Sequence, residues 1–123
     1  MSREKRNSGN AVADKSMDFA VRVVNLYRHL VSKWNEHVMS RQLLRSGTSI
    51  GANVREAMSA QTKADFVAKM SITLKECNET GYWLELMLRT SFITDEQYRS
   101  LDSDRREIFA LLTSIIKSAR YKG

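Results

Sequence analysis

Core-facing positions between residues 66 and 88 recur at spacings of three and four. In order they are Phe66, Met70, Leu74, Cys77, Gly81, Leu84 and Leu88. This spacing places all of them on one face of a single long α-helix. Such a helix is stable only when its apolar face is buried against other elements. The chain of 123 residues contains no proline and only five glycines, so it permits long helices and offers little of the turn punctuation that sheets need.

The same period occurs in three further segments, and we expect helices at residues 16–33, 40–60, 62–89 and 95–120. The expected core stripes of the other three are Phe19, Val23, Leu26, Leu30 and Trp34; Leu43, Gly47, Ile50, Val54 and Met58; and Tyr98, Leu101, Ile108, Leu112, Ile115 and Ala119. Thr62 is a predicted N-cap, and Thr94 with Gln97 forms a predicted capping box. Four helices joined by short connections predict an all-α fold, an antiparallel up-down-up-down four-helix bundle. We assign residues 15–120 to this domain and residues 1–14 to a disordered basic tail.

The third helix carries apolar residues on a second face. Ile72, Trp83 and Leu86 project away from its core stripe, together with Ala68. A monomer would leave this strip in water, and exposed apolar patches mark interaction sites. We therefore predict a homo-oligomer with Ile72, Trp83 and Leu86 at the subunit interface.

Residues suited to catalysis or metal binding are few. His29 and His37 lack zinc-site spacing, and a di-metal bundle would need Glu-x-x-His motifs on two helices. Asp18, Asp102, Asp104 and Glu107 lie off the core stripes or near helix ends. Cys77 lies on a core stripe, where a thiol behaves as a small hydrophobe. There is no phosphate-binding loop or nucleophile elbow, and we predict a protein that is not an enzyme and uses no cofactor or metal.

The charge is unevenly distributed. The net charge is +6, and residues 1–62 hold ten basic and five acidic side chains, against ten and nine in residues 63–123. A basic face of this kind is typical of contact with the phosphate backbone of RNA or DNA, without reading of bases. The candidate contact residues are Lys15, Arg22, Lys33, Arg41, Arg45 and Arg55, with Arg3, Lys5 and Arg6 in the tail.

The centre of the chain resembles a known family. The matching residues are Arg45-Ser46-Gly47 with Ser49-Ile50, Asn53 with Glu56-Ala57, Phe66, Leu74-Lys75-Glu76 and Glu79. With weaker flanks over residues 16–120, they resemble the bacterial four-helix bundle family also called 23S rRNA intervening-sequence proteins. The resemblance implies a cyclic homopentamer. The family is more distantly similar to accessory proteins of diversity-generating retroelements, which form basic pentameric rings that bind nucleic acid and a reverse transcriptase.

Four polar residues occupy positions that the family marks: Asn53, Glu56, Glu76 and Glu79. We interpret them as a structural polar network, in which Asn53 and Glu56 pair with Lys or Arg on the third helix or across a subunit boundary. Arg55 stands where the family more often carries a small apolar residue, which makes the local surface more basic.

Three features of the sequence indicate where the protein is located. No apolar stretch is long enough to span a bilayer, and the N-terminus lacks the apolar segment of a secretory signal. The lone Cys77 fits a reducing compartment, so we predict a cytoplasmic bacterial protein.

Nucleic-acid binding is the leading interpretation of the function. The alternative is a protein-interaction scaffold, and a metal- or ligand-binding bundle is a distant third.

Overall fold

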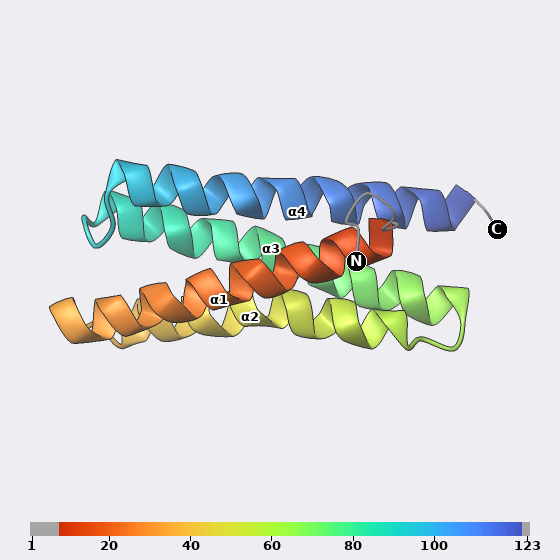
Figure 1. Ribbon diagram of the computed structural model, residues 1–123, viewed down its shortest axis with the longest axis horizontal. Coiled ribbons are helices and arrows are strands. Elements are labelled where there is room, and N and C mark those ends of the chain that lie inside the picture. The colour runs from red at the N-terminus through yellow and green to blue at the C-terminus, as the bar shows by residue number, and fades with distance from the viewer. Residues whose placement is uncertain (1–7, 122–123) are drawn as a thin grey trace.

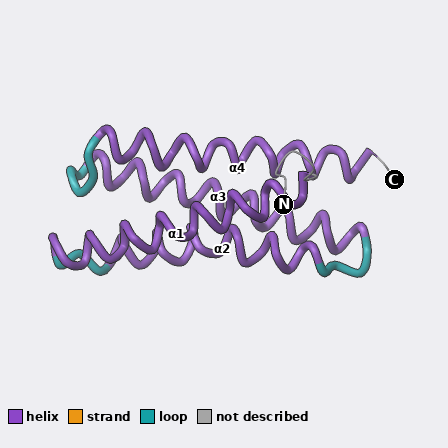
Figure 2. Tube along the Cα trace, viewed as in Figure 1, coloured by secondary structure: helices purple, strands orange, loops and turns teal. Residues whose placement is uncertain are grey.

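The computed structural model describes residues 8–121, which form four α-helices and no strand. They are α1 (Ser8–Trp34), α2 (Val38–Met58), α3 (Lys63–Arg89) and α4 (Asp95–Tyr121). Each helix runs opposite to the one before it (Figure 1). Contacts join α1 to α2, α2 to α3, α3 to α4 and α1 to α4, so the helices stand at the corners of a square. The short connections lie at the two ends (Figure 2), and the predicted four-helix bundle is confirmed.

Helix α1 begins eight residues before the predicted start. Residues 8–14, predicted to belong to a disordered tail, are helical. The reason is that Val12 and Ser16 are buried and continue the stripe of Phe19 by two turns toward the N-terminus. Residues 1–7, with Arg3, Lys5 and Arg6, lie outside the described residues.

Polar caps set the starts of three helices. Thr62 accepts a hydrogen bond from the Asp65 amide at 3.0 Å, and Thr94 and Gln97 bond each other's amides at 3.1 and 2.9 Å, so both predicted caps are confirmed. At α2 the cap is Glu36, whose carboxylate accepts from three amides, those of Val38, Met39 and Ser40, at 2.8–3.2 Å. Burial alone would raise the pKa of Glu36, but these amide donors lower it below its ordinary value.

The core lies between the four predicted stripes. Its largest fully buried side chains include Phe19, Leu30, Leu43, Ile50, Met70, Leu84, Met87, Ile108 and Leu112. Two residues of the predicted stripes are exposed. Trp34 and Met58 are exposed because each is the last residue of its helix, where the neighbouring helices no longer cover it. Trp34 instead meets Phe92 edge to face, with ring centroids 5.7 Å apart.

The buried face of α3 is turned toward α2 relative to the prediction. Thr73 and Thr80 are fully buried, whereas Leu74 is only half-buried. Thr80 can be buried because its hydroxyl donates to the Glu76 carbonyl at 2.8 Å and contacts the Ser46 hydroxyl at 3.0 Å. The α2–α3 contact therefore mixes small polar side chains with apolar ones.

Candidate functional site

Two predicted nucleic-acid contacts lie at the edge between α1 and α4, and both are bound by carboxylates. Lys15 pairs with Glu107, and Arg22 donates to Asp104 at 2.6 Å. Arg22 also donates to the Ser100 hydroxyl at 2.8 Å. Asp18 lines the same hollow as Lys15, Asp104 and Glu107. Two cations thus face three carboxylates, and this edge has no positive excess to offer a phosphate.

A third predicted contact, Arg45, lies at the edge between α2 and α3. It donates to Glu76 at 3.2 Å and to Glu79, and Glu79 also accepts from the Trp83 indole at 2.9 Å. Here one cation balances two carboxylates.

The rest of the predicted polar network lies at this same edge, nearer the start of α3. The Lys69 ammonium approaches the Glu56 carboxylate at 3.2 Å. Asn53 is half-buried, and its side chain makes no hydrogen bond within residues 8–121. The structure therefore connects Glu56 to Lys69, and Glu76 and Glu79 to Arg45, as two separate groups.

The remaining basic candidates are placed differently. Arg41 and Arg55 are exposed on α2, and neither has a carboxylate partner in the described part of the chain. Lys33 holds its ammonium 5.2 Å from the centre of the Trp34 ring. Arg28, which the sequence reasoning missed, is also exposed on α1 and equally without an acidic partner among the described residues. Three unpaired arginines thus lie on the outer side of α1 and α2. On α3 and α4, the exposed Lys63, Lys75, Lys117 and Arg120 also lack an acidic partner within residues 8–121.

The register of α1 and α2 brings Arg28 and Arg41 to the same end. A Cβ atom built on Gly47 would lie 2.9 Å from the Val23 side chain, which shows how closely the two helices meet. Counting five residues from this contact along each antiparallel helix places Arg28 level with Gln42, the neighbour of Arg41. Arg55 is fourteen positions further along α2, or about 21 Å away.

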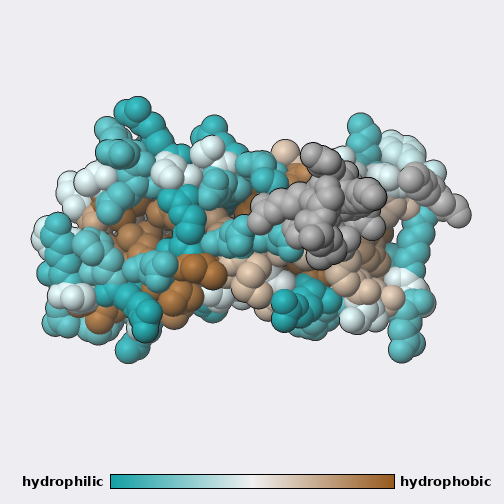
Figure 3. Space-filling model, viewed as in Figure 1, coloured by the Kyte–Doolittle hydropathy of each residue, from teal (hydrophilic) through white to brown (hydrophobic). Residues whose placement is uncertain are grey.

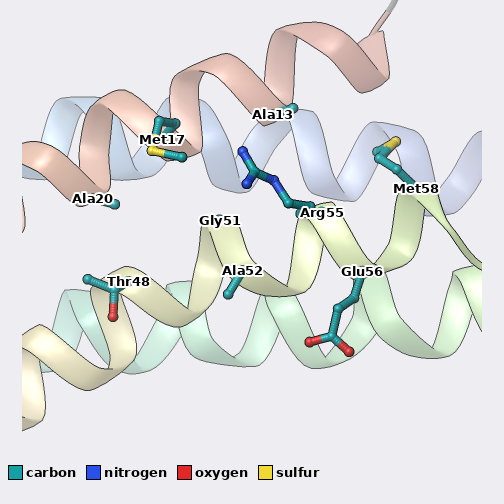
Figure 4. Close-up of a pocket in the computed structure, with 9 residues that line it drawn as sticks. All are labelled: Ala13, Met17, Ala20, Thr48, Gly51, Ala52, Arg55, Glu56 and Met58. Carbon is teal, nitrogen blue, oxygen red and sulfur yellow. The ribbon is translucent and has the colours of Figure 1, made fainter.

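On the outer side of the bundle, a groove lies between α1 and α2. Its volume is about 470 Å³, and we call it the α1–α2 groove; it is lined by Ala13, Met17, Ala20, Thr48, Gly51, Ala52, Arg55, Glu56 and Met58. Met17 and Arg55 face one another across it, and the Arg55 guanidinium reaches from α2 toward α1 (Figure 4). The alanines and the glycine of the lining have small side chains, which leave the floor of the groove unfilled, and the lining is mainly apolar.

The groove continues into an exposed apolar strip on α1. Met17, Val21 and Val24 are 48%, 52% and 36% exposed, and we call them the α1 strip. Apolar atoms gather along part of α1 in Figure 3. The sequence reasoning missed this strip, although its spacing of four and three is the same helical signal that identified the core.

Two of the three apolar residues predicted at an interface on α3 are less exposed than expected. Ile72 is exposed, but Trp83 and Leu86 are half-buried within the chain itself. Trp83 is held by its bond to Glu79, and Tyr82 meets it edge to face at 5.0 Å. Ile72 and Tyr82 are thus the exposed large apolar residues on this helix.

Asp102 is buried, contrary to its predicted position off the core stripe. Its side chain is 4% exposed and accepts from Arg105 at 2.6 Å and Arg106 at 2.8 Å. The Arg105 guanidinium lies against α3, where a Cβ atom on Gly81 would be 2.6 Å from its central carbon. Burial raises the pKa of Cys77 to about 11, and the nearby Arg105 only partly offsets this. The thiol is therefore protonated at neutral pH and is a poor nucleophile.

The histidines and the acidic residues form no metal site in the part of the chain that the structure describes. His37 bonds the Asn35 side chain at 2.8 Å, and no group of three or more His, Cys, Asp or Glu side chains within residues 8–121 could hold an ion. Across the same residues, no helix combines the length and the hydrophobicity that crossing a membrane requires.

Comparison with known proteins decides the family. Residues 9–114 match the family model described as 23S rRNA-intervening sequence protein. The chain belongs to this family. A crystal structure of a protein of unknown function from the S23 ribosomal protein family of Bacteroides thetaiotaomicron VPI-5482 is 61% identical, with a TM-score of 0.89. The alignment covers 90% of this chain and 99% of that one, and no protein of curated function matches.

Membership of the 23S rRNA-intervening sequence family confirms the resemblance seen in the sequence. The family match starts at residue 9, close to the start of α1, and so includes residues 9–14, which the sequence alone had left in the tail. The Bacteroides relative is a protein of unknown function.

Proposed function

We propose that this chain is a non-enzymatic, oligomeric, cytoplasmic bundle that binds the phosphate backbone of RNA or DNA. The contact surface is the outer side of α1 and α2, with Arg28, Arg41 and Arg55 as its principal cations; Lys33 faces a separate hollow beside the α3–α4 connection. The observation that carries the proposal is that these arginines lack acidic partners among the described residues, whereas Arg22 and Arg45 are neutralised.

Whether a cation already has a carboxylate partner decides how readily it can bind a phosphate. A cation that already holds a carboxylate must break that pair before it can bind a phosphate, and a free cation need only release its counterions. The arginines at the two ends of α2 lie about 21 Å apart, which spans several phosphates of one strand. The α1–α2 groove is lined by no aromatic side chain, so contacts to the backbone should dominate there over contacts to bases.

Two triple variants with the same change in charge test the proposal. In the first, Arg28, Arg41 and Arg55 are replaced by Gln; in the second, Lys15, Arg22 and Arg45 are replaced by Gln. Binding of fluorescent RNA and DNA oligonucleotides is measured by anisotropy between about 50 and 200 mM salt. The first variant should lose about 2–3 from the log–log salt slope, at about 0.7–0.9 for each phosphate contact.

The second triple variant is the control for net charge, because it removes three cations that the structure shows to be paired. It should retain most of the parent slope, and circular dichroism checks that both variants stay helical. Equal losses in the two variants would mean that only net charge matters and that the outer face is not a site. If the parent fails to bind at about 50 mM salt, nucleic-acid binding is wrong.

We also propose that the chain assembles through α3 into a homo-oligomer, with a pentamer favoured by the family resemblance. Ile72 supports this most directly, because it is exposed and apolar on a helix whose opposite face is already buried. Trp83 and Leu86 would contribute their remaining exposed surface. Ile72→Glu should reduce the mass measured by light scattering to that of a monomer while helicity is kept. A parent protein that is monomeric at micromolar concentration would contradict the assembly.

A protein-interaction scaffold is the second candidate function. It is favoured by one observation that phosphate binding does not require, namely the apolar α1 strip beside the groove.

A further inference from the structure

The outer side of α1 and α2 combines two properties that phosphate binding does not explain together. Its arginines have no acidic partners among the described residues, and the surface between them is apolar and hollowed. A surface used only for phosphates would gain nothing from exposing Met17, Val21 and Val24. An occupant that matches this surface must carry both negative charge and an apolar side.

We propose that the α1–α2 groove and the α1 strip dock an acidic amphipathic helix of a protein partner. In this arrangement the apolar side of the partner helix lies along the groove and its acidic residues pair with the arginines at either end. The inference goes beyond nucleic-acid binding, because it depends on the apolar lining as well as on the charge.

The dimensions of the surface favour a helix. A helix that lies in a groove between two others contacts both, and its distance depends on the side chains at the contact. Ala13, Ala20, Gly51 and Ala52 keep the floor low, so a third helix can approach closely. Its acidic residues should be about fourteen positions apart, the separation of Arg41 from Arg55, with apolar residues at spacings of three and four between them.

The charges favour a partner protein over a second copy of this chain. On α3, the helix proposed above for assembly, Glu76 and Glu79 already hold Arg45 within the same molecule. They would have to release it before they could pair with Arg41 or Arg55. An independent acidic helix carries no such penalty.

The shape of the groove distinguishes a helix from other anionic occupants. A bilayer surface binds protruding apolar residues, whereas a hollow of about 470 Å³ would remain unfilled against a flat membrane. Single-stranded nucleic acid places its bases on aromatic side chains, and the groove lining contains none. An amphipathic helix fills the hollow with side chains and meets the arginines with carboxylates.

A synthetic peptide tests the docking. The probe is a helix of about 18 residues with a leucine and alanine side and two glutamates fourteen positions apart; the matched control has lysines in their place. Binding to the full-length protein is measured by fluorescence anisotropy. The acidic peptide should bind at least about tenfold more tightly than the basic one.

Two variants separate this docking from nucleic-acid binding. Met17→Gln with Met58→Gln removes apolar lining from two exposed positions and leaves the charge unchanged. It should weaken peptide binding about tenfold and change RNA binding less than twofold. Arg41→Gln with Arg55→Gln should weaken the binding of both the peptide and RNA. Peptide binding without RNA binding would keep this inference and reject the proposed function, and the reverse result would do the opposite.

Several results would overturn the inference. They are equal binding of the acidic and basic peptides, no binding of either, or undiminished peptide binding by the double methionine variant. A fall in the mass of the oligomer in that variant would show that a second copy occupies the groove. Binding of the parent, but not of that variant, to vesicles of phosphatidylglycerol and phosphatidylcholine would show that the face is a lipid surface.

Discussion

Replacing Asp102 by alanine should destabilise the bundle more than any other single change of a charged residue. Asp102 has a side chain that is only 4% exposed, and its partner Arg105 is 13% exposed. Their bond is 2.6 Å long, and the Arg105 guanidinium lies against α3 beside Gly81. Removal of the carboxylate would leave a buried cation without its counter-charge.

The cost of Asp102→Ala follows from these exposures. Breaking a buried pair by removing one partner costs about 3–5 kcal/mol. The second partner, Arg106, is mostly exposed, so its loss adds at most about 1 kcal/mol. Burial alone would lower the pKa of Arg105, but Asp102 raises it, so the two charges stabilise each other in the folded state. We therefore expect a loss of about 3–5 kcal/mol in the free energy of unfolding.

Urea unfolding followed by circular dichroism measures this loss. Asp104→Ala is the matched control, because Asp104 lies on the same helix and also binds an arginine, yet is half-exposed. It should cost no more than about 1 kcal/mol. The double variant Asp102→Leu with Arg105→Met removes both charges and should recover most of the loss. A cost below about 1 kcal/mol for Asp102→Ala, or no recovery in the double variant, would refute the reasoning.

Three further predictions concern the core, a helix cap and the buried thiol. Leu84→Ala should cost about 3–5 kcal/mol in urea unfolding and Leu74→Ala clearly less, because Leu84 is fully buried and Leu74 is half-buried; equal costs would contradict the observed α3 face. Glu36→Gln should cost about 1 kcal/mol at neutral pH. Because folding lowers the pKa of Glu36, the Glu36 carboxylate stabilises the fold fully above pH 4.5. This stabilisation disappears as the pH falls through the lower folded pKa, so the stabilities of parent and variant should converge in acid. Folding raises the pKa of Cys77 from 9.0 to about 11, so the stabilising contribution of the protonated thiol is complete below pH 9 and is lost as the pH rises toward 11. Iodoacetamide should label the thiol at pH 8 far more slowly in the native protein than in the unfolded protein. Equal labelling rates would show that the native thiol is accessible.

The sequence predicted the helices well because the period of apolar residues is a local property. The caps at Thr62 and Thr94 use side chains three residues apart, which can be recognised within one segment. The buried threonines of α3 could not be recognised in this way. Thr73 and Thr80 satisfy their hydroxyls on the preceding turn, so they can enter the core although hydropathy places them outside it.

The candidate site was harder to predict because it depends on which charges meet between helices. Arg22 and Asp104 are 82 positions apart, and no helical wheel places one beside the other. Consequently, charge clusters that appeared free in the sequence were found to be neutralised, and Arg28 went unnoticed. Asp102 and Arg106 are a different case, because their spacing of four residues is a recognisable helical pair.

The order of the helices around the square has a consequence for how the chain folds. Three of the four edges join helices that follow one another in the sequence, and only the α1–α4 edge joins distant segments. Short loops make contacts between successive helices inexpensive in chain entropy, which predicts folding in microseconds to milliseconds. During synthesis, α1, α2 and α3 can associate before α4 leaves the ribosome. The closing step is then the arrival of α4, which brings both Asp104 to Arg22 and the buried Asp102–Arg105 pair to α3.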